Sequence, residues 1–222
     1  ARIHAVLRLH DLRVCDVQVT DAAEGETLRR FVWAPGQLVI VDRGYSNAPG
    51  VLSVAEQGAD VLVRVNRGAL PLYCAKGECI DVLAWCRSLV GHAATERAAT
   101  VAVGKGDRRR ERTGRLIGFR LPERQAGEAR ARARRENGPS GTPEQREAAA
   151  YVILLTTAPA NRLSAPRAVE AYRLRWQIEL QFKRWKSLCH FDRLPNYRDD
   201  TIRSWLTAKV LLGLLLDRIG KS

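Results

Sequence analysis

The sequence of 222 residues contains no methionine and no long apolar run. A helix that crosses a membrane needs about 20 consecutive apolar residues, and the longest candidate here runs only from residue 210 to 216. The opening residues, ARIHAVLRLHD, also lack the pattern of a secretory signal peptide. We therefore expect a soluble, intracellular protein with no membrane span. Because the sequence opens with Ala1 and holds no Met, we do not expect it to begin at an initiator.

Cysteine is also sparse, with five residues that are odd in number and scattered. The gaps of four and six residues between Cys74, Cys79 and Cys86 do not match the C-x₂-C spacing of zinc sites, and only His92 lies nearby. We expect reduced, partly buried thiols.

Acidic residues are too few to balance the basic ones. Lys and Arg number 37 against 24 Asp and Glu, so the net charge is +13 and the isoelectric point is near 10.2. Residues 105 to 135 hold 12 basic and 4 acidic residues, which gives this segment +8 of the total. Such an excess predicts a polyanionic partner, nucleic acid first. A solvated basic helix is the alternative for this segment, whose candidate DNA-binding residues are Arg130, Arg132, Arg134 and Arg135.

The order of predicted elements indicates an α/β protein, and a hydrophobic content of 45% is enough for a core. Alternating patterns and capping signals predict a hairpin at 2–10 and 12–20, a helix at 22–33, a strand at 38–42, a helix at 47–57 and a strand at 59–66. Later segments predict strands at 80–84, 100–103 and 115–121, a basic helix at 125–136, a linker at 137–143, a strand at 151–157 and a helix at 199–219.

The strand at 38–42 ends on a carboxylate, Asp42, and a turn follows it. Ligands and catalytic groups favour the carboxyl ends of strands in α/β sheets, so Asp42 is a candidate site residue. The alternative is an aspartate that only caps the next helix or starts the turn.

Residues 171–190 have no Gly or Pro and follow a Ser-Ala-Pro capping segment, which predicts a single helix. Tyr172, Arg175, Glu179 and Lys186 fall within a stripe about 60° wide on that helix, between two apolar shoulders. A stripe of this kind indicates a cleft. The alternative is a surface helix with i,i+4 ion pairs such as Arg175–Glu179, each contributing a few tenths of a kcal/mol.

These four residues resemble, in type and spacing, the tyrosine, arginine, glutamate, lysine signature of DDE transposases of bacterial insertion sequences, of the insertion-sequence-four type. The run Asp42-Arg43-Gly44-Tyr45 is similar to the segment around the family's second catalytic aspartate. The resemblance extends from residue 1 to about 220 and implies a protein of the bacterial cytoplasm, associated with the nucleoid.

The resemblance implies a ribonuclease H-like core that carries an inserted lobe. Residues 1–66 would be the N-terminal part of the core, 67–150 an inserted, mainly β lobe with the basic helix and linker, and 151–222 the C-terminal part. In the family's strand order, residues 2–10 and 12–20 are strands two and three, so the first strand and its catalytic aspartate would be missing. Asp11, Asp16 and Asp21 are poor substitutes because none lies on a central strand. We therefore expect a fragment that binds DNA without cutting it.

The resemblance also implies the roles of the site residues. Asp42 and Glu179 would be catalytic ligands of Mg²⁺ or Mn²⁺. Arg175 and Lys186 would hold phosphates, and Tyr172 would donate its hydroxyl to the DNA backbone. Tyr151 could stack on an extruded base, or could simply pack at the start of its strand.

The implied function is cut-and-paste transposition, with metal-dependent strand cleavage and strand transfer at transposon ends. The implied partners are double-stranded DNA of the terminal inverted repeats and a second copy in a homodimer. A non-catalytic DNA-binding remnant and another ribonuclease H-like metal nuclease are the alternatives.

Overall fold

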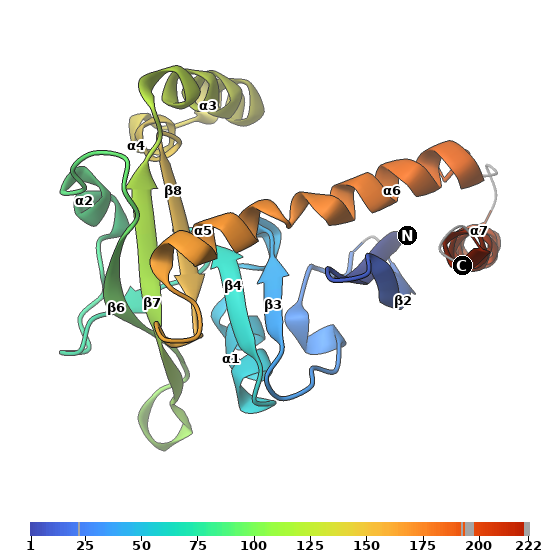
Figure 1. The fold of residues 1–222 in the computed structure, drawn as a ribbon, viewed down its shortest axis with the longest axis horizontal. Helices are drawn as coiled ribbons and strands as arrows, with labels where there is room; N and C mark the ends of the chain where they lie inside the picture. The colour runs from blue at the N-terminus through green and yellow to red at the C-terminus, as the bar shows by residue number, and fades with distance from the viewer. Residues whose placement is uncertain (22, 192, 194–197, 220–222) are drawn as a thin grey trace. The chain divides into compact units, whose positions relative to one another are not determined.

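The computed structural model describes residues 1–21, 23–191, 193 and 198–219 (Figure 1). The chain divides into two compact units. We call Thr27–Tyr172 the sheet unit, and Ala1–Glu26 with Arg173–Ser222 the hairpin unit. Each is described by itself.

A mixed six-stranded sheet forms the sheet unit. Only β3 and β4 pair in parallel, and the other neighbours are antiparallel. The predicted α/β class is confirmed. The strand order is β3 (Leu38–Val41), β4 (Asp60–Arg64), β8 (Tyr151–Thr156), β7 (Arg110–Arg120), β6 (Thr95–Val103) and β5 (Leu72–Tyr73).

Helices and short 3-10 turns connect these strands. The α-helices are α1 (Ala48–Glu56), α2 (Val82–Arg87), α3 (Glu123–Asn137), α4 (Pro143–Ala148) and α5 (Ala165–Arg173). The 3-10 turns are η1 (Leu28–Arg30), η2 (Arg43–Tyr45), η3 (Gly106–Arg108) and η4 (Gly138–Ser140). α1 shows why these segments fold locally: Asn47 caps it by accepting the Gly50 N–H at 2.9 Å, and its buried Val51 and Val54 face the core.

One hydrophobic cluster joins the middle of the sheet to α5. Leu62, Ile117 and Leu154 come from three adjacent strands, and Ala168 of α5 is fully buried against them. Tyr172 packs on this cluster while remaining partly exposed. The packing therefore fixes the helix that carries the first signature residue.

The hairpin unit contains β1 (Arg2–Arg8), β2 (Arg13–Thr20), α6 (Trp176–Cys189) and α7 (Asp199–Ile219). β1 and β2 form the predicted antiparallel hairpin. The centre of the core is Trp185, which is 1% exposed and contacts Phe182 and Phe191 at ring-centroid distances of 5.8 and 5.5 Å. Within the described residues, no helix is both long and apolar enough to cross a membrane.

Two predicted elements were wrong. The helix predicted at 22–33 is reduced to η1, apart from Ala22, which lies outside the described residues. Phe31 and Trp33 are both buried, and two residues that far apart would point to nearly opposite sides of a helix. The strand predicted at 80–84 contains the start of α2, because the Asp81 carboxylate caps the helix by accepting N–H groups of Leu83 and Ala84 at 3.0 Å.

The helix predicted at 171–190 is two helices, α5 and α6, separated by a turn at Leu174 and Arg175. The turn is closed by i→i+3 bonds such as the Gln177 N–H to the Leu174 carbonyl at 3.0 Å. It coincides with the boundary between the two units. The predicted single stripe of Tyr172, Arg175, Glu179 and Lys186 on one helix is therefore wrong.

Three smaller differences concern strand pairing, the linker and the connector. β1 and β2 form a two-stranded sheet, whereas the family order predicted them in one sheet with β3. The linker predicted at 137–143 contains η4 and leads into α4 through a capping box at Thr142. The connector predicted at 191–198 falls largely on residues outside those described.

Gly213 of α7 is required for the contact between α7 and Trp185. A Cβ atom added there would lie 2.8 Å from the indole Nε1. We predict that Gly213→Ala lowers the free energy of unfolding by about 1–3 kcal/mol, because the indole must shift in a packed core. Urea unfolding followed by circular dichroism measures this. Gly127→Ala on α3, which meets nothing within 4 Å, is the matched control and should be neutral or slightly stabilising. Equal effects of the two substitutions would contradict this role of Gly213.

Candidate functional site

Asp42 follows β3 directly, where two parallel strands end together. Val41 of β3 lies opposite Val63 of β4, so both strands present their carboxyl ends at one edge of the sheet. The exposed Asp42 carboxylate accepts the Arg43 N–H at 2.7 Å and thereby caps η2. Asp42 therefore starts the turn, whereas the next helix α1 is capped by Asn47, and the Asp42 side chain stands at the predicted edge.

The structure brings Tyr172 to Asp42 from 130 residues away. The Tyr172 hydroxyl donates a hydrogen bond to Asp42 Oδ1 over 3.4 Å. Both residues belong to the sheet unit. One residue of the signature and the candidate aspartate therefore share one edge of the sheet.

Two arginines hold the loop that leads from β8 to α5. Arg115 of β7 donates to the Ala158 carbonyl from Nε at 3.1 Å and from Nη2 at 3.0 Å, and also to the Leu163 carbonyl. Its Nη1 pairs with Glu96 at 2.5 Å. Arg162, on the loop itself, pairs with the buried Asp60 at 2.7 Å. These contacts fix the start of α5 and so the position of Tyr172.

The sequence interpretation missed both arginines. Arg115 lies in a strand that was predicted, and its side chain is only 14% exposed. A charged residue beside the apolar run LIGF is the only signal that the sequence offers. Its partners are backbone carbonyls more than 40 residues away, which no local pattern specifies.

Arg175 and Glu179 form an ion pair in the hairpin unit, with Nη1 and Oε1 2.7 Å apart. This confirms the i,i+4 pair of the alternative interpretation. The Arg175 side chain is 21% exposed and that of Glu179 is 49% exposed, so the carboxylate remains accessible. Lys186 is exposed two turns further along α6.

The candidate metal ligands therefore come from both units, Asp42 from the sheet unit and Glu179 from the hairpin unit. Both are exposed carboxylates, and carboxylate oxygen is the donor that Mg²⁺ and Mn²⁺ prefer. Within either unit, the described residues hold no group of three or more His, Cys, Asp and Glu side chains suited to a metal ion. Each carboxylate fits as one ligand of a divalent ion.

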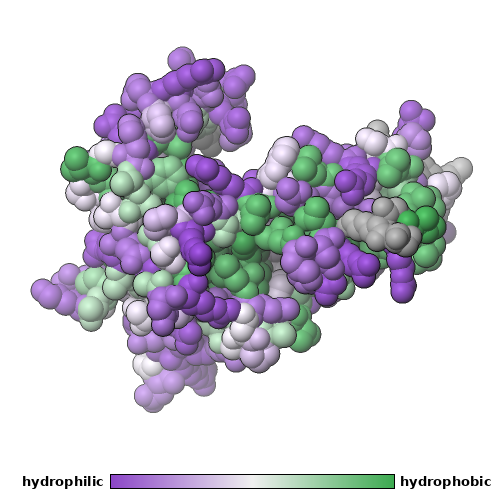
Figure 2. All heavy atoms as spheres, viewed as in Figure 1, coloured by the Kyte–Doolittle hydropathy of each residue, from purple (hydrophilic) through white to green (hydrophobic). Residues whose placement is uncertain are grey.

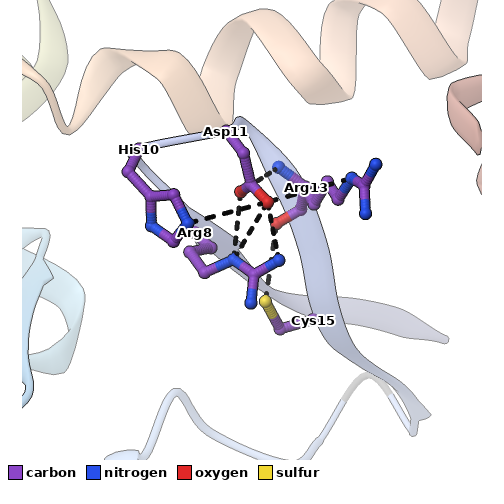
Figure 3. A network of polar contacts seen from close by, with 5 residues as sticks. All are labelled: Arg8, His10, Asp11, Arg13 and Cys15. Atoms are coloured by element: carbon purple, nitrogen blue, oxygen red, sulfur yellow. Dashed lines mark hydrogen bonds and ion pairs between the residues drawn. The ribbon is translucent and has the colours of Figure 1, made fainter. Parts of the chain in front are cut away.

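Asp11 shows what a structural aspartate looks like in this chain (Figure 3). It lies in the β1–β2 turn, as predicted, and its two oxygens face Arg8 at 3.0 and 2.6 Å. It also accepts the Arg13 N–H at 3.2 Å. The hydrogen bond from Arg8 is the main cause that holds the pKa of Asp11 well below its ordinary value of 3.8. Its lone pairs are occupied by these donors, so it is a poor metal ligand.

The predicted basic helix is present as α3 and forms a hydrophilic end of the sheet unit (Figure 2). Arg130 pairs with Glu123 at 2.9 Å. Arg132, Arg134 and Arg135 are exposed and make no ion pair within the described part of the chain. Of the four candidates, three therefore present unneutralised guanidinium groups to solvent.

Tyr151 opens β8, as predicted, and pairs across the sheet with Arg120. Its side chain is half-buried. The position is compatible with packing and leaves part of the ring accessible.

Comparisons with known proteins agree with these features. The profile of a family described as "Transposase DDE domain" matches residues 2–215. The chain is 34% identical over 225 residues to the InsL protein for insertion sequence element IS186A of Escherichia coli strain K12. It is equally similar to the transposase for insertion sequence element IS421 of Escherichia coli. Each alignment covers 98% of this chain and 60% of the relative, so the chain spans 60% of the length of these relatives.

The Asp11 network predicts how the stability of the hairpin unit depends on pH. Because the pKa of Asp11 is lower in the folded chain, its contribution to stability is present above pH 3.8 and is lost as the pH falls further. Asp11→Asn should therefore lower the melting temperature most above pH 5, and its deficit should shrink towards pH 2. Thermal unfolding from pH 2 to 7 measures this.

Arg8→Gln should lower the melting temperature with the same dependence on pH. The double variant should lower it little further, because both changes remove the same interaction between Arg8 and Asp11. A deficit of Asp11→Asn that is constant with pH would contradict the assignment.

Proposed function

The chain belongs to the DDE transposase family, and from this premise we propose that it is part of an insertion sequence transposase of the insertion-sequence-four type. The observation that carries the proposal is the contact between Tyr172 and Asp42. It joins the signature segment to the carboxylate that follows β3. The whole protein would carry out cut-and-paste transposition, with strand cleavage and strand transfer at transposon ends.

The proposed architecture is a ribonuclease H-like core with an insertion. Residues 1–66 and 151–222 would supply the core, and residues 67–150 the inserted lobe. The parallel pair β3–β4 and its neighbour β8 support the core assignment. The strands of the insertion, β5, β6 and β7, extend the same sheet beyond β8.

Asp42 and Glu179 would hold Mg²⁺ or Mn²⁺. A bound divalent ion supplies Lewis acidity to phosphoryl oxygens and lowers the pKa of a ligated water. The residues around the two carboxylates would position the DNA. Arg175 has five donors and can keep its ion pair with Glu179 while donating to a phosphate. Lys186 would act as a point charge on a second phosphate. Tyr172 would donate its single hydroxyl proton to the DNA backbone in place of Asp42.

Double-stranded DNA of the terminal inverted repeats is the proposed substrate. The exposed guanidinium groups of α3 and the net charge of +13 support contact with a duplex. A homodimer is proposed for the complete protein, and apolar side chains exposed on α7, namely Trp205, Leu211, Leu212, Leu215 and Ile219, support a protein contact there. We also propose that Tyr151 stacks on an extruded base, which its half-exposed ring supports.

The metal assignment is tested by removing one charge at a time. In the complete reading frame that contains this chain, Asp42→Asn and Glu179→Gln should each reduce Mg²⁺-dependent cleavage of transposon ends by about 100-fold. Each substitution keeps the shape of the side chain, so DNA binding should stay within about twofold.

Glu26→Gln removes the same charge from an exposed glutamate outside the site and is the matched control. Full cleavage by Glu179→Gln would overturn the assignment.

The DNA-binding assignment of α3 is tested by changing Arg130, Arg132, Arg134 and Arg135 to Gln. Binding to duplexes of unrelated sequence should weaken uniformly, and the slope of log K against log salt should become shallower by roughly one unit for each phosphate that the protein no longer neutralises. Fluorescence anisotropy between 50 and 200 mM NaCl is the measurement. Neutralising four exposed basic residues elsewhere, Arg29, Lys76, Arg167 and Arg218, controls for net charge. An unchanged slope would leave α3 as a solvated helix.

A further inference from the structure

The basic segment that is continuous in the sequence is divided between two ends of the sheet unit. Residues 105–112 form the tip of the β6–β7 hairpin around η3, whereas α3 begins three residues after the other end of β7. Figure 1 shows the two features at opposite ends of β7. The chain therefore presents two basic surfaces, which we call the hairpin tip (residues 105–112) and the α3 surface.

The hairpin tip is strongly basic and only partly neutralised. Its eight residues include five basic and two acidic side chains, a net charge of +3. Arg109 pairs with Glu111 at 2.9 Å and Arg110 with Glu56 at 3.0 Å. Lys105, Arg108 and Arg112 are exposed and have no ion pair among the residues that the structure describes. Three cations remain available to a phosphate backbone.

The turn that carries these cations is held in a defined shape. The Arg108 N–H donates to the Lys105 carbonyl at 3.2 Å, and the Arg109 N–H to the Gly106 carbonyl at 3.0 Å. Gly104 has φ +86°, and a side chain there would collide with the Arg108 carbonyl oxygen. A preformed turn loses less conformational entropy on binding than a mobile loop.

The strand that joins the two surfaces is about as long as one repeat of DNA. β7 has 11 residues, and at about 3.3 Å per residue it extends roughly 36 Å. One turn of B-DNA is about 34–36 Å. Phosphates one turn apart lie on the same side of a straight duplex, so two protein contacts at this separation can engage one face of the DNA.

We propose that one duplex contacts both the hairpin tip and the α3 surface, about one helical turn apart. The proposal rests on the proposed function, because it takes DNA as the partner. Lys105, Arg108 and Arg112 then contact phosphates and contribute affinity that does not depend on base sequence. Two contacts on one duplex strengthen each other, because binding at one basic surface raises the effective concentration of the other surface near the same DNA.

The test varies both the protein and the duplex length. Lys105→Gln, Arg108→Gln and Arg112→Gln are combined in one variant, and binding is measured with duplexes of about 24 and 8 base pairs. At 3.4 Å per pair the short duplex is about 27 Å long and cannot reach both surfaces. The hairpin-tip variant should bind the long duplex about tenfold more weakly than the unmodified chain, and the short duplex within about twofold.

Arg29→Gln, Arg167→Gln and Arg218→Gln, combined, remove the same charge from other exposed positions and should change both affinities little. Circular dichroism and the melting temperature show that each variant is folded.

The role of the hairpin tip is overturned if the unmodified chain binds the long duplex and the hairpin-tip variant binds it with the same affinity. That result leaves the proposed function intact. An equal loss of affinity for both duplexes overturns the bridging of one duplex. Failure of the unmodified chain to bind either duplex contradicts DNA binding itself.

Discussion

The loop between β8 and α5 depends on the guanidinium of Arg115. Ala158 and Leu163 lie in irregular chain, and their carbonyls receive hydrogen bonds from this one side chain. A buried carbonyl left without a donor costs about 1–3 kcal/mol, so removing Arg115 would release the loop. α5 starts two residues after Leu163, and Tyr172 lies two turns along it. The contact of Tyr172 with Asp42 therefore depends on an arginine that holds the loop before α5.

The parts of the fold that were predicted correctly are those that local patterns specify. Alternation predicted the β1–β2 hairpin, and a short apolar run predicted β3 and the place of Asp42 at its end. The apolar run at Tyr151–Thr156 and the long helix α7 were also predicted because their signals lie within one window of sequence. The site residues were predicted from the spacing of the tyrosine, arginine, glutamate, lysine signature. Local sequence patterns alone would not have identified them as a site.

The wrong predictions of secondary structure share a different cause. In these segments, contacts between residues distant in the sequence determine the structure. No Gly or Pro marks the break at Leu174 and Arg175, so composition favoured one helix. Phe31 and Trp33 are both buried although the chain there is not helical, because their burial depends on contacts within the folded sheet unit. Asp81 lies in the segment predicted as a strand, but the burial of Leu83 and Cys86 favours the helix α2 that Asp81 caps. Spacing along the chain also could not show that Tyr172 and Arg175 fall in different units.

The basic surfaces are built almost entirely from arginine, with Lys105 the single lysine among the 12 basic residues from 105 to 135. A guanidinium stays protonated at every physiological pH, and lysine acetylation cannot neutralise it. A cell therefore has few chemical means of switching this charge off. If these surfaces contact DNA as proposed, neither pH nor acetylation would switch the binding, and the concentration of competing ions and chromosomal DNA would decide how long the protein stays at each place.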